Sequence, residues 1–140
     1  MWDPAAFDAF VEQEGVEAVV FTFEPTLLQG RLGGSHTYVE ASGASVRKIH
    51  VKHKPDGDVR GLAGFFWFRD GGVFGELDRI PDDRGRELCA DHVLKYLVDG
   101  GRRVGAFPLD GYVHLGSPVE LQEFAFWNAF HRMFTAGSES

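Results

Sequence analysis

Four cationic residues gather in the stretch that ends at Pro55: Arg47, Lys48, Lys52 and Lys54. Ammonium and guanidinium groups hold phosphate and carboxylate oxygens through charge-assisted hydrogen bonds. The cluster can therefore bind a small anion, although the whole chain carries a formal net charge of −7. The alternative is a solvated strand face that binds no ligand.

Histidine is the other residue type here that suits chemistry, and the chain has six beside a single cysteine. The histidines show neither helical i, i+4 spacing nor His-x-His strand spacing, and one cysteine provides no thiolate set. We therefore disfavour a metal site built from His36, His50, His53 and His114. Cys89 is expected on the apolar face of a helix, as a small hydrophobic residue rather than a nucleophile. Ser-His-Asp catalysis lacks its Gly-x-Ser-x-Gly turn.

Turn signals and periodicity predict the elements that would position these residues. Asp3 and Pro4 predict a helix start and Gly15 predicts its end, which gives helix 4–14. Residues 17–23 are β-branched and aromatic and almost continuously apolar, which indicates a strand buried on both faces, as in a parallel sheet.

The middle of the chain predicts strands. Residues 36–40 and 46–54 form a hairpin pattern, and the strongly apolar 61–68 contains Gly64. A glycine inside a strand marks a bulge or a close ligand approach, the alternative being the packing of a neighbouring backbone. The remaining segments are expected as follows: loop 24–35, a short helical or irregular stretch 73–77, polar loop 80–86, helix 87–99, and strands 103–108 and 111–115.

The last helix, 117–134, begins at a capping box, Ser117 to Glu120, with Pro118 at the first helical position. Its aromatic residues surround most of the helix instead of forming one stripe: Phe124, Phe126, Trp127, Phe130 and Phe134. Such a helix must pack on two sides. We expect a partner subunit or a missing half of the fold to cover the second side, the alternative being a helix buried in its own core.

Three segments, in this order, resemble the second half of the sugar-1-phosphate nucleotidyltransferase (NDP-sugar pyrophosphorylase) family. Segment 46–68, with Lys-His-Lys-Pro and then Leu-Ala-Gly-Phe-Phe-Trp-Phe, is similar to the family's Glu-Lys-Pro and Ala-Gly-Ile-Tyr-x-Phe strands. Segment 90–109 resembles the family's helix, Gly-Lys-Val turn and following strand. Segment 110–118, Asp-Gly-Tyr-Val-His-Leu-Gly-Ser-Pro, resembles Gly-x-Trp-x-Asp-x-Gly-Thr-Pro and is the most specific.

The resemblance implies an α/β fold: a partial nucleotidyltransferase-like mixed sheet flanked by helices, lacking the N-terminal nucleotide-binding half. It covers one domain, 1–135, and leaves 136–140 as a disordered tail. Family members join a sugar 1-phosphate to a nucleoside triphosphate and release pyrophosphate. The resemblance therefore implies a sugar 1-phosphate ligand, Mg²⁺ as cofactor, and a nucleotide-binding partner chain or a homo-oligomer formed through helix 117–134.

The resemblance also assigns substrate-binding residues, and it assigns no catalytic one. Lys52 or, in a competing alignment, Lys54 matches the lysine that contacts the sugar phosphate. Gly64 matches the glycine whose backbone lies against the sugar, and Tyr112 stands where tryptophan is usual. The other two assignments are His114, at the position of an aspartate that ligates Mg²⁺, and Gly116.

Several family features are absent from the sequence. The sugar-binding glutamate is missing in both alignments, and imidazole is a poor replacement for the oxygen ligands that Mg²⁺ prefers. No Gly-x-Gly-Thr-Arg loop is found to cradle a triphosphate, since no helix start follows the glycines at 30–34. We therefore expect this chain to be inactive by itself. The alternative is a non-catalytic subunit, derived from the family, that binds a sugar phosphate or a partner.

Composition narrows the remaining classes. A length of 140 residues fits one domain, and 44% hydrophobic residues are ordinary for a globular protein. The single cysteine rules out an internal disulfide, and no signal peptide is visible, so we expect a cytoplasmic protein. No apolar run is long enough to span a membrane. The acidic balance disfavours binding to nucleic acid.

Overall fold

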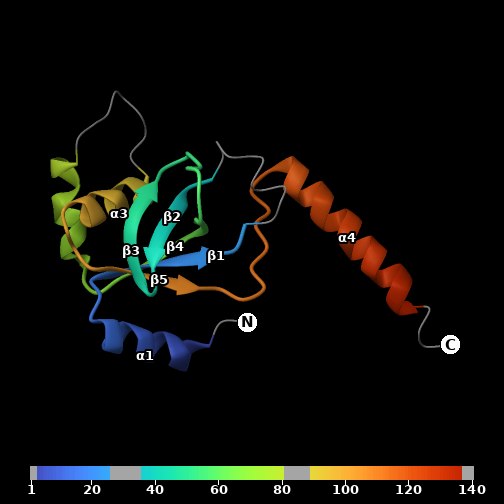
Figure 1. Cartoon of the computed structure of the whole chain (residues 1–140), viewed down its shortest axis with the longest axis horizontal. Helices are drawn as coiled ribbons and strands as arrows, with labels where there is room; N and C mark the ends of the chain where they lie inside the picture. Colours follow the sequence, from blue (N-terminus) through green and yellow to red (C-terminus); the bar gives the residue numbers. More distant parts are fainter. Residues whose placement is uncertain (1–2, 26–35, 81–88, 137–140) are drawn as a thin grey trace.

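The computed structural model describes residues 3–25, 36–80 and 89–136 of the chain. No helix of these residues is long and apolar enough to cross a membrane. The elements, shown in Figure 1, are α1 Pro4–Glu14, β1 Ala18–Phe23, β2 Tyr38–Ser42, β3 Ser45–His50, β4 Arg60–Phe68, the 3-10 helix η1 Gly71–Arg79, α3 Ala90–Asp99, β5 Val104–Pro108 and α4 Pro118–Ala136.

The five strands form one mixed sheet in the order β1-β4-β2-β3-β5, which closes on itself as a small barrel. Strand β1 pairs antiparallel with β4 and parallel with β5. The closure between β3 and β5 is narrow: Ser45 pairs with Gly105, and the Ala106 amide donates to the Ala44 carbonyl at 2.8 Å. The predicted α/β class with a mixed sheet is confirmed.

Strand β1 is the centre of the core and is fully buried along its length, as its sequence predicts. Alternate side chains of a strand point to opposite faces. Ala18 and Val20 therefore pack on the side of Leu94 in α3, whereas Phe21 packs with Phe7 of α1. Helices α1 and α3 cover different sides of the sheet (Figure 1), so β1 is the layer between two apolar clusters.

Strand β4 contains a bulge around Gly64. Val20 pairs with Phe66 but Thr22 pairs with Leu62, so β4 has extra residues between the two pairs. Gly64 has φ +83°, a backbone conformation that side chains with a Cβ disfavour. Apart from Ala63 and Phe65, its chain neighbours, no described residue has an atom within 4 Å of where its Cβ would be. The glycine thus marks a bulge, and the alternative of a closely packed neighbouring backbone is wrong.

The hairpin of β2 and β3 is confirmed, but β3 ends at His50. Lys52 has a positive φ of 50° and lies in the turn that follows, and its amide donates to the Thr37 hydroxyl at 3.3 Å. The chain therefore leaves the sheet before it reaches Lys54.

Parts of the predicted loops 24–35 and 80–86 and of the predicted tail 136–140 lie outside the described residues, namely 26–35, 81–88 and 137–140. The first residue of the predicted tail, Ala136, belongs to α4.

Two local predictions are wrong. Residues 111–115 form no strand, because the Tyr112 side chain bonds the backbone of β4 and no ladder with a neighbouring strand forms there. Cys89 does not lie on the apolar face of a helix: α3 begins at Ala90, and Cys89 is its N-cap residue, with Sγ 2.9 Å from Nδ1 of His92.

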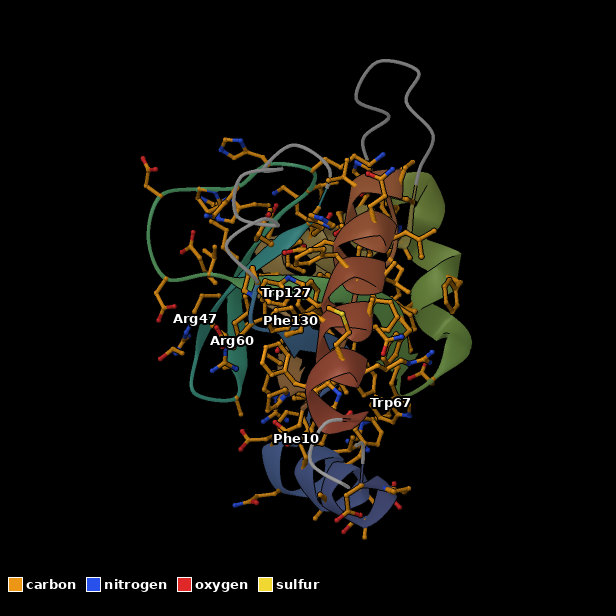
Figure 2. All side chains as sticks on the ribbon, turned by 90° about the vertical axis from the view of Figure 1, so that its right-hand side faces the viewer. Phe10, Arg47, Arg60, Trp67, Trp127 and Phe130 are labelled. Atoms are coloured by element: carbon orange, nitrogen blue, oxygen red, sulfur yellow. The ribbon has the colours of Figure 1, made fainter. Side chains whose placement is uncertain are left out.

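Helix α4 is buried only at its first turn. Glu120 is buried, whereas every residue from Leu121 to Thr135 except Glu123 is exposed. The helix extends away from the sheet (Figure 1), with Trp127 and Phe130 on its surface (Figure 2). The alternative of a helix buried in its own core is therefore wrong.

We expect Gly64→Ala to lower the free energy of unfolding by about 1–2 kcal/mol, because an alanine at positive φ brings its Cβ close to its own backbone. Urea denaturation followed by circular dichroism measures the change. Gly75→Ala is the matched control: Gly75 lies in η1, has no positive φ and has free space around a Cβ. Equal losses for the two variants would contradict the conformational explanation.

Candidate functional site

The candidate site centres on a buried contact between a histidine and a glutamate from distant parts of the chain. His36 precedes β2, and Glu120 lies in the first turn of α4. His36 Nε2 lies 3.1 Å from Glu120 Oε1, and the two residues are only 6% and 3% exposed. The ring of His114 stands edge-to-face with that of His36, at 4.6 Å between centroids.

The start of α4 holds Glu120 in place. The Glu120 amide donates to the Ser117 hydroxyl at 3.3 Å, as the capping-box sequence predicts. The Ser117 hydroxyl in turn donates to Glu120 Oε2 at 2.8 Å, so the carboxylate binds the side chain of the cap residue. This arrangement leaves Oε1 directed at His36.

Tyr112 sets the orientation and the tautomer of His114. The Tyr112 hydroxyl donates its proton to the Ala63 carbonyl at 2.9 Å, within the bulge of β4. Its oxygen lies 3.1 Å from Nδ1 of His114, and because its proton is already used it can only accept there. Nδ1 of His114 therefore carries the proton, and Nε2 presents its lone pair.

Thr37 ties the lysine turn to the same place. Its hydroxyl donates to Oδ2 of Asp91 at 2.5 Å and accepts from the Lys52 amide, while its carbonyl accepts from the Leu62 amide at 3.0 Å. Thr37 is also the neighbour of His36 in the chain. The lysine turn, strand β4 and the loop before α4 thus all meet segment 36–37.

Burial and the Glu120 charge govern the electrostatics of the site. Burial lowers the pKa of His36, and this outweighs the Glu120 carboxylate, which favours the imidazolium. The imidazole of His36 is consequently neutral at pH 7. Burial, followed by the Glu120 charge, raises the pKa of both Tyr38 and Tyr112, so both phenols keep their protons.

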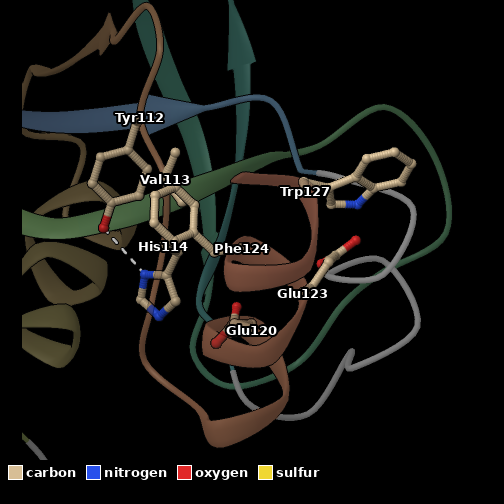
Figure 3. A pocket seen from close by; sticks show the side chains of 7 residues that line it. All are labelled: Tyr112, Val113, His114, Glu120, Glu123, Phe124 and Trp127. Carbon is tan, nitrogen blue, oxygen red and sulfur yellow. Dashed lines mark hydrogen bonds between the residues drawn. The ribbon is translucent and has the colours of Figure 1, made fainter. Parts of the chain in front are cut away.

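A pocket of about 200 Å³ opens between this cluster and α4 (Figure 3). His114 and Glu120 form its polar floor, and exposed aromatic side chains of α4 form a wall. Its full lining is Tyr112, Val113, His114, Glu120, Glu123, Phe124 and Trp127. The pocket can hold a few water molecules or a small polar group.

Of the six predicted substrate residues, the structure brings two into this pocket, Tyr112 and His114. Gly64 borders Ala63, the acceptor of the Tyr112 hydroxyl. Gly116 has no room for a side chain, since a Cβ there would lie 2.3 Å from Nε2 of His114. The remaining two, Lys52 and Lys54, are exposed and are not among the residues that line the pocket.

The donor set does not fit the Mg²⁺ that the sequence resemblance implies. Mg²⁺ demands near-octahedral coordination by oxygen, usually carboxylates, phosphates and water. At this site His114 and His36 offer nitrogen, and Glu120 is the carboxylate that accompanies them. We therefore assign no Mg²⁺-dependent step to this chain.

Sequence reasoning missed the importance of three residues. The sequence predicts Glu120 only as a helix cap and gives no signal at Thr37. It places His36 only in a disfavoured metal set with His50, His53 and His114. His50 instead lies 2.5 Å from Glu40 on the hairpin. The sequence offers one signal: His36 and the capping-box residue Glu120 flank the segments that carry the predicted site residues.

No protein-family model and no curated protein matches this sequence. Solved structures do match its fold. The inositol-1-phosphate CTP transferase from T. maritima superposes with a TM-score of 0.61 at 17% identity, over 86% of this chain and 47% of that chain. For the nucleoside-diphosphate-sugar pyrophosphorylase from Vibrio cholerae RC9 the TM-score is 0.58 at 15% identity, over 89% of this chain and 49% of that chain.

These likenesses confirm that the fold is that of part of a nucleotidyltransferase structure. The chain spans about half the length of the two transferases, whereas nearly all of the chain takes part in the match. At such low identity the likeness concerns the fold alone. The substrate-binding role of the six residues stays a prediction.

We expect Tyr112→Phe to lower the free energy of unfolding by about 1–3 kcal/mol, because it leaves the Ala63 carbonyl without its donor and His114 without its acceptor. Chemical denaturation measures the loss. Tyr96→Phe in α3, away from the site, is the matched control and should change stability by less than about 0.5 kcal/mol. A Tyr112 loss no greater than that of the control would show that the hydroxyl positions nothing.

Proposed function

We propose that this chain supplies the sugar-phosphate-binding half of a nucleotidyltransferase that joins a sugar 1-phosphate to a nucleoside triphosphate. The observation that carries the proposal is the match of nearly the whole chain to about half of two transferase structures. The half proposed is the C-terminal one, because the three sequence segments resemble that half in order.

The assignment to the sugar-phosphate-binding half is supported by contacts between the segments that carry the sequence resemblance. Strand β4 at Leu62 and the turn of Lys52 both contact Thr37. The loop of Tyr112 and His114 contacts His36 through the His114 ring and the bulge of β4 through the Tyr112 hydroxyl. The backbone at Gly64 has open space in front of it, as close approach of a sugar would need. The exposed ammonium of Lys52 or Lys54 would contact the phosphate as a point charge.

A specific observation favours a second candidate, a non-catalytic subunit that binds a sugar phosphate without turning it over. His114 stands at the position where the family has a metal-binding aspartate. The side chains around it offer imidazole nitrogens instead of the oxygen ligands that Mg²⁺ prefers. Phosphoryl-type transfer depends largely on charge neutralisation and positioning. A chain that lacks both the metal carboxylate and the triphosphate loop would retain binding and lose turnover.

Ligand binding tests both candidates, because both expect this chain to bind a sugar phosphate, and pyrophosphate release by the chain alone would contradict the second. We expect the chain alone to release no pyrophosphate from any nucleoside triphosphate in the presence of a panel of sugar and inositol 1-phosphates and Mg²⁺. Isothermal titration should nevertheless detect binding of at least one member of the panel. The absence of binding across the panel would overturn both candidates.

We expect Lys52→Ala to weaken sugar-phosphate binding about tenfold or more, since a charge-assisted hydrogen bond contributes about 1.5–3 kcal/mol. Lys48→Ala is the matched control, because Lys48 is equally exposed on β3 but lies outside the motif. Alanine keeps the positive φ of position 52 as unfavourable as lysine does, so folding effects should be similar to wild type. Equal losses for Lys52 and Lys48 would contradict the alignment.

Helix α4 is proposed to pack against the nucleotide-binding half, carried by a preceding segment or a separate chain. One support is the aromatic surface of α4, where Trp127 is 56% and Phe126 is 62% exposed. The other is that the chain spans about half of a transferase structure. Exposed apolar patches of this kind mark interfaces.

We expect this helix to make the isolated chain self-associate. Multi-angle light scattering should show an apparent mass that rises with protein concentration, because large apolar side chains of α4 such as Phe126 and Trp127 are exposed in the described part of the chain. Replacing Trp127 and Phe130 together by glutamate should restore the monomeric mass of 15.5 kDa. A wild-type chain that stays monomeric at every concentration would contradict an apolar docking surface on α4.

A further inference from the structure

The cluster of two imidazoles and one carboxylate, which does not fit Mg²⁺, suits another class of metal ion. His36, His114 and Glu120 each offer one ligand atom, and these atoms all lie within 4.8 Å of one another. Two imidazoles and one carboxylate, with a remaining position for solvent, are a ligand set that Zn²⁺ takes in proteins. We propose that these three side chains bind a transition-metal ion of the Zn²⁺ type, whether or not the chain binds a sugar phosphate.

The contact between His36 and Glu120 is the first support. Nε2 of His36 is buried and makes no hydrogen bond of good geometry with any described residue, although Glu120 Oε1 lies 3.1 Å away. A buried polar atom in that state costs free energy. A cation beside both atoms removes the cost, because the imidazole lone pair and the carboxylate oxygen can both coordinate it.

The hydrogen bonding of His114 is the second, independent support. Nδ1 donates to the Tyr112 oxygen, so Nε2 is the nitrogen with the free lone pair. Metal-bound histidines in proteins are oriented in this way, by a hydrogen bond from the other ring nitrogen. Gly116 leaves space on the Nε2 side of the ring, which a Cβ at 2.3 Å would fill.

Ligand separations define the movement that binding requires. Ligands about 2.1 Å from a tetrahedral ion lie about 3.4 Å apart. His36 and Glu120 are already that close, so the adjustment falls on His114, whose ring must approach by up to about 1.4 Å, from within 4.8 Å to about 3.4 Å. His114 belongs to a segment outside any helix or strand, which can shift. Two of the three ligands, His114 and Glu120, line the pocket (Figure 3), which would supply solvent for the fourth position.

The test uses the full chain after removal of metal by a chelator and dialysis. We expect Co²⁺ to give the intense visible absorption of a tetrahedral complex, Zn²⁺ to displace it at one ion per chain, and excess Mg²⁺ to leave it unchanged. Elemental analysis of the dialysed Zn²⁺ complex checks the stoichiometry. A chain that takes up no Co²⁺ at micromolar concentrations would overturn the proposal without any variant.

Variants locate the site. His114→Gln removes a half-buried ligand, and Gly116→Ala fills the open side of the ring while leaving all three ligands in the chain. Both should abolish the Co²⁺ spectrum. Tyr112→Phe removes only the orienting hydroxyl and should weaken Zn²⁺ binding about 10–100-fold. Circular dichroism of each metal-free variant checks that it is folded.

His53→Gln is the matched control. His53 follows β3, with its ring 6.2 Å from that of His50, and His50 contacts Glu40 on the hairpin. These residues are the competing place for an adventitious ion. We expect the His53 variant to bind Zn²⁺ as wild type does. Binding that survives in His114→Gln and Gly116→Ala but disappears in His53→Gln would place the ion on the hairpin and overturn the proposal.

Discussion

The structure of the site depends on one buried carboxylate. Among residues 118–135 of α4 only Glu120 is buried, and it lies against His36 at the entrance to β2. An ionised carboxylate leaves water at a cost of several kcal/mol unless partners compensate it. The Ser117 hydroxyl supplies one partner, and His36 faces the other oxygen. The direction in which α4 leaves the sheet follows from this contact at its first turn.

From that contact a continuous series of interactions runs to the opposite strand. The ring of His36 touches His114, whose Nδ1 binds Tyr112, whose hydroxyl reaches the carbonyl of Ala63. That carbonyl lies in the bulge beside Gly64, where the ladder between β1 and β4 changes register. The bulge at Gly64 in β4 is therefore connected by hydrogen bonds and ring contacts to the cluster of His36, His114 and Glu120.

The fold match and the surface of the chain both support the proposed partner. Nearly all of the chain superposes on about half of each of two nucleotidyltransferases. Helix α4 exposes aromatic residues such as Phe126 and Trp127, whose rings contact each other. Hydrophobic area of this kind is normally buried on association. The proposed nucleotide-binding partner would account for both observations at once.

The sequence by itself determined the local elements and their class. Asp3, Pro4 and Gly15 fix the bounds of α1, and the continuous apolar run of β1 fixes its burial on both faces, because capping and periodicity are local properties. Tertiary structure alone decided that 111–115 forms no strand. It alone decided that Glu120 faces His36 as well as capping α4, since no local pattern records which distant side chain a buried carboxylate will meet. The cluster of His36, His114 and Glu120 joins residues far apart in the chain, and only the closed sheet brings them within a few ångströms of one another.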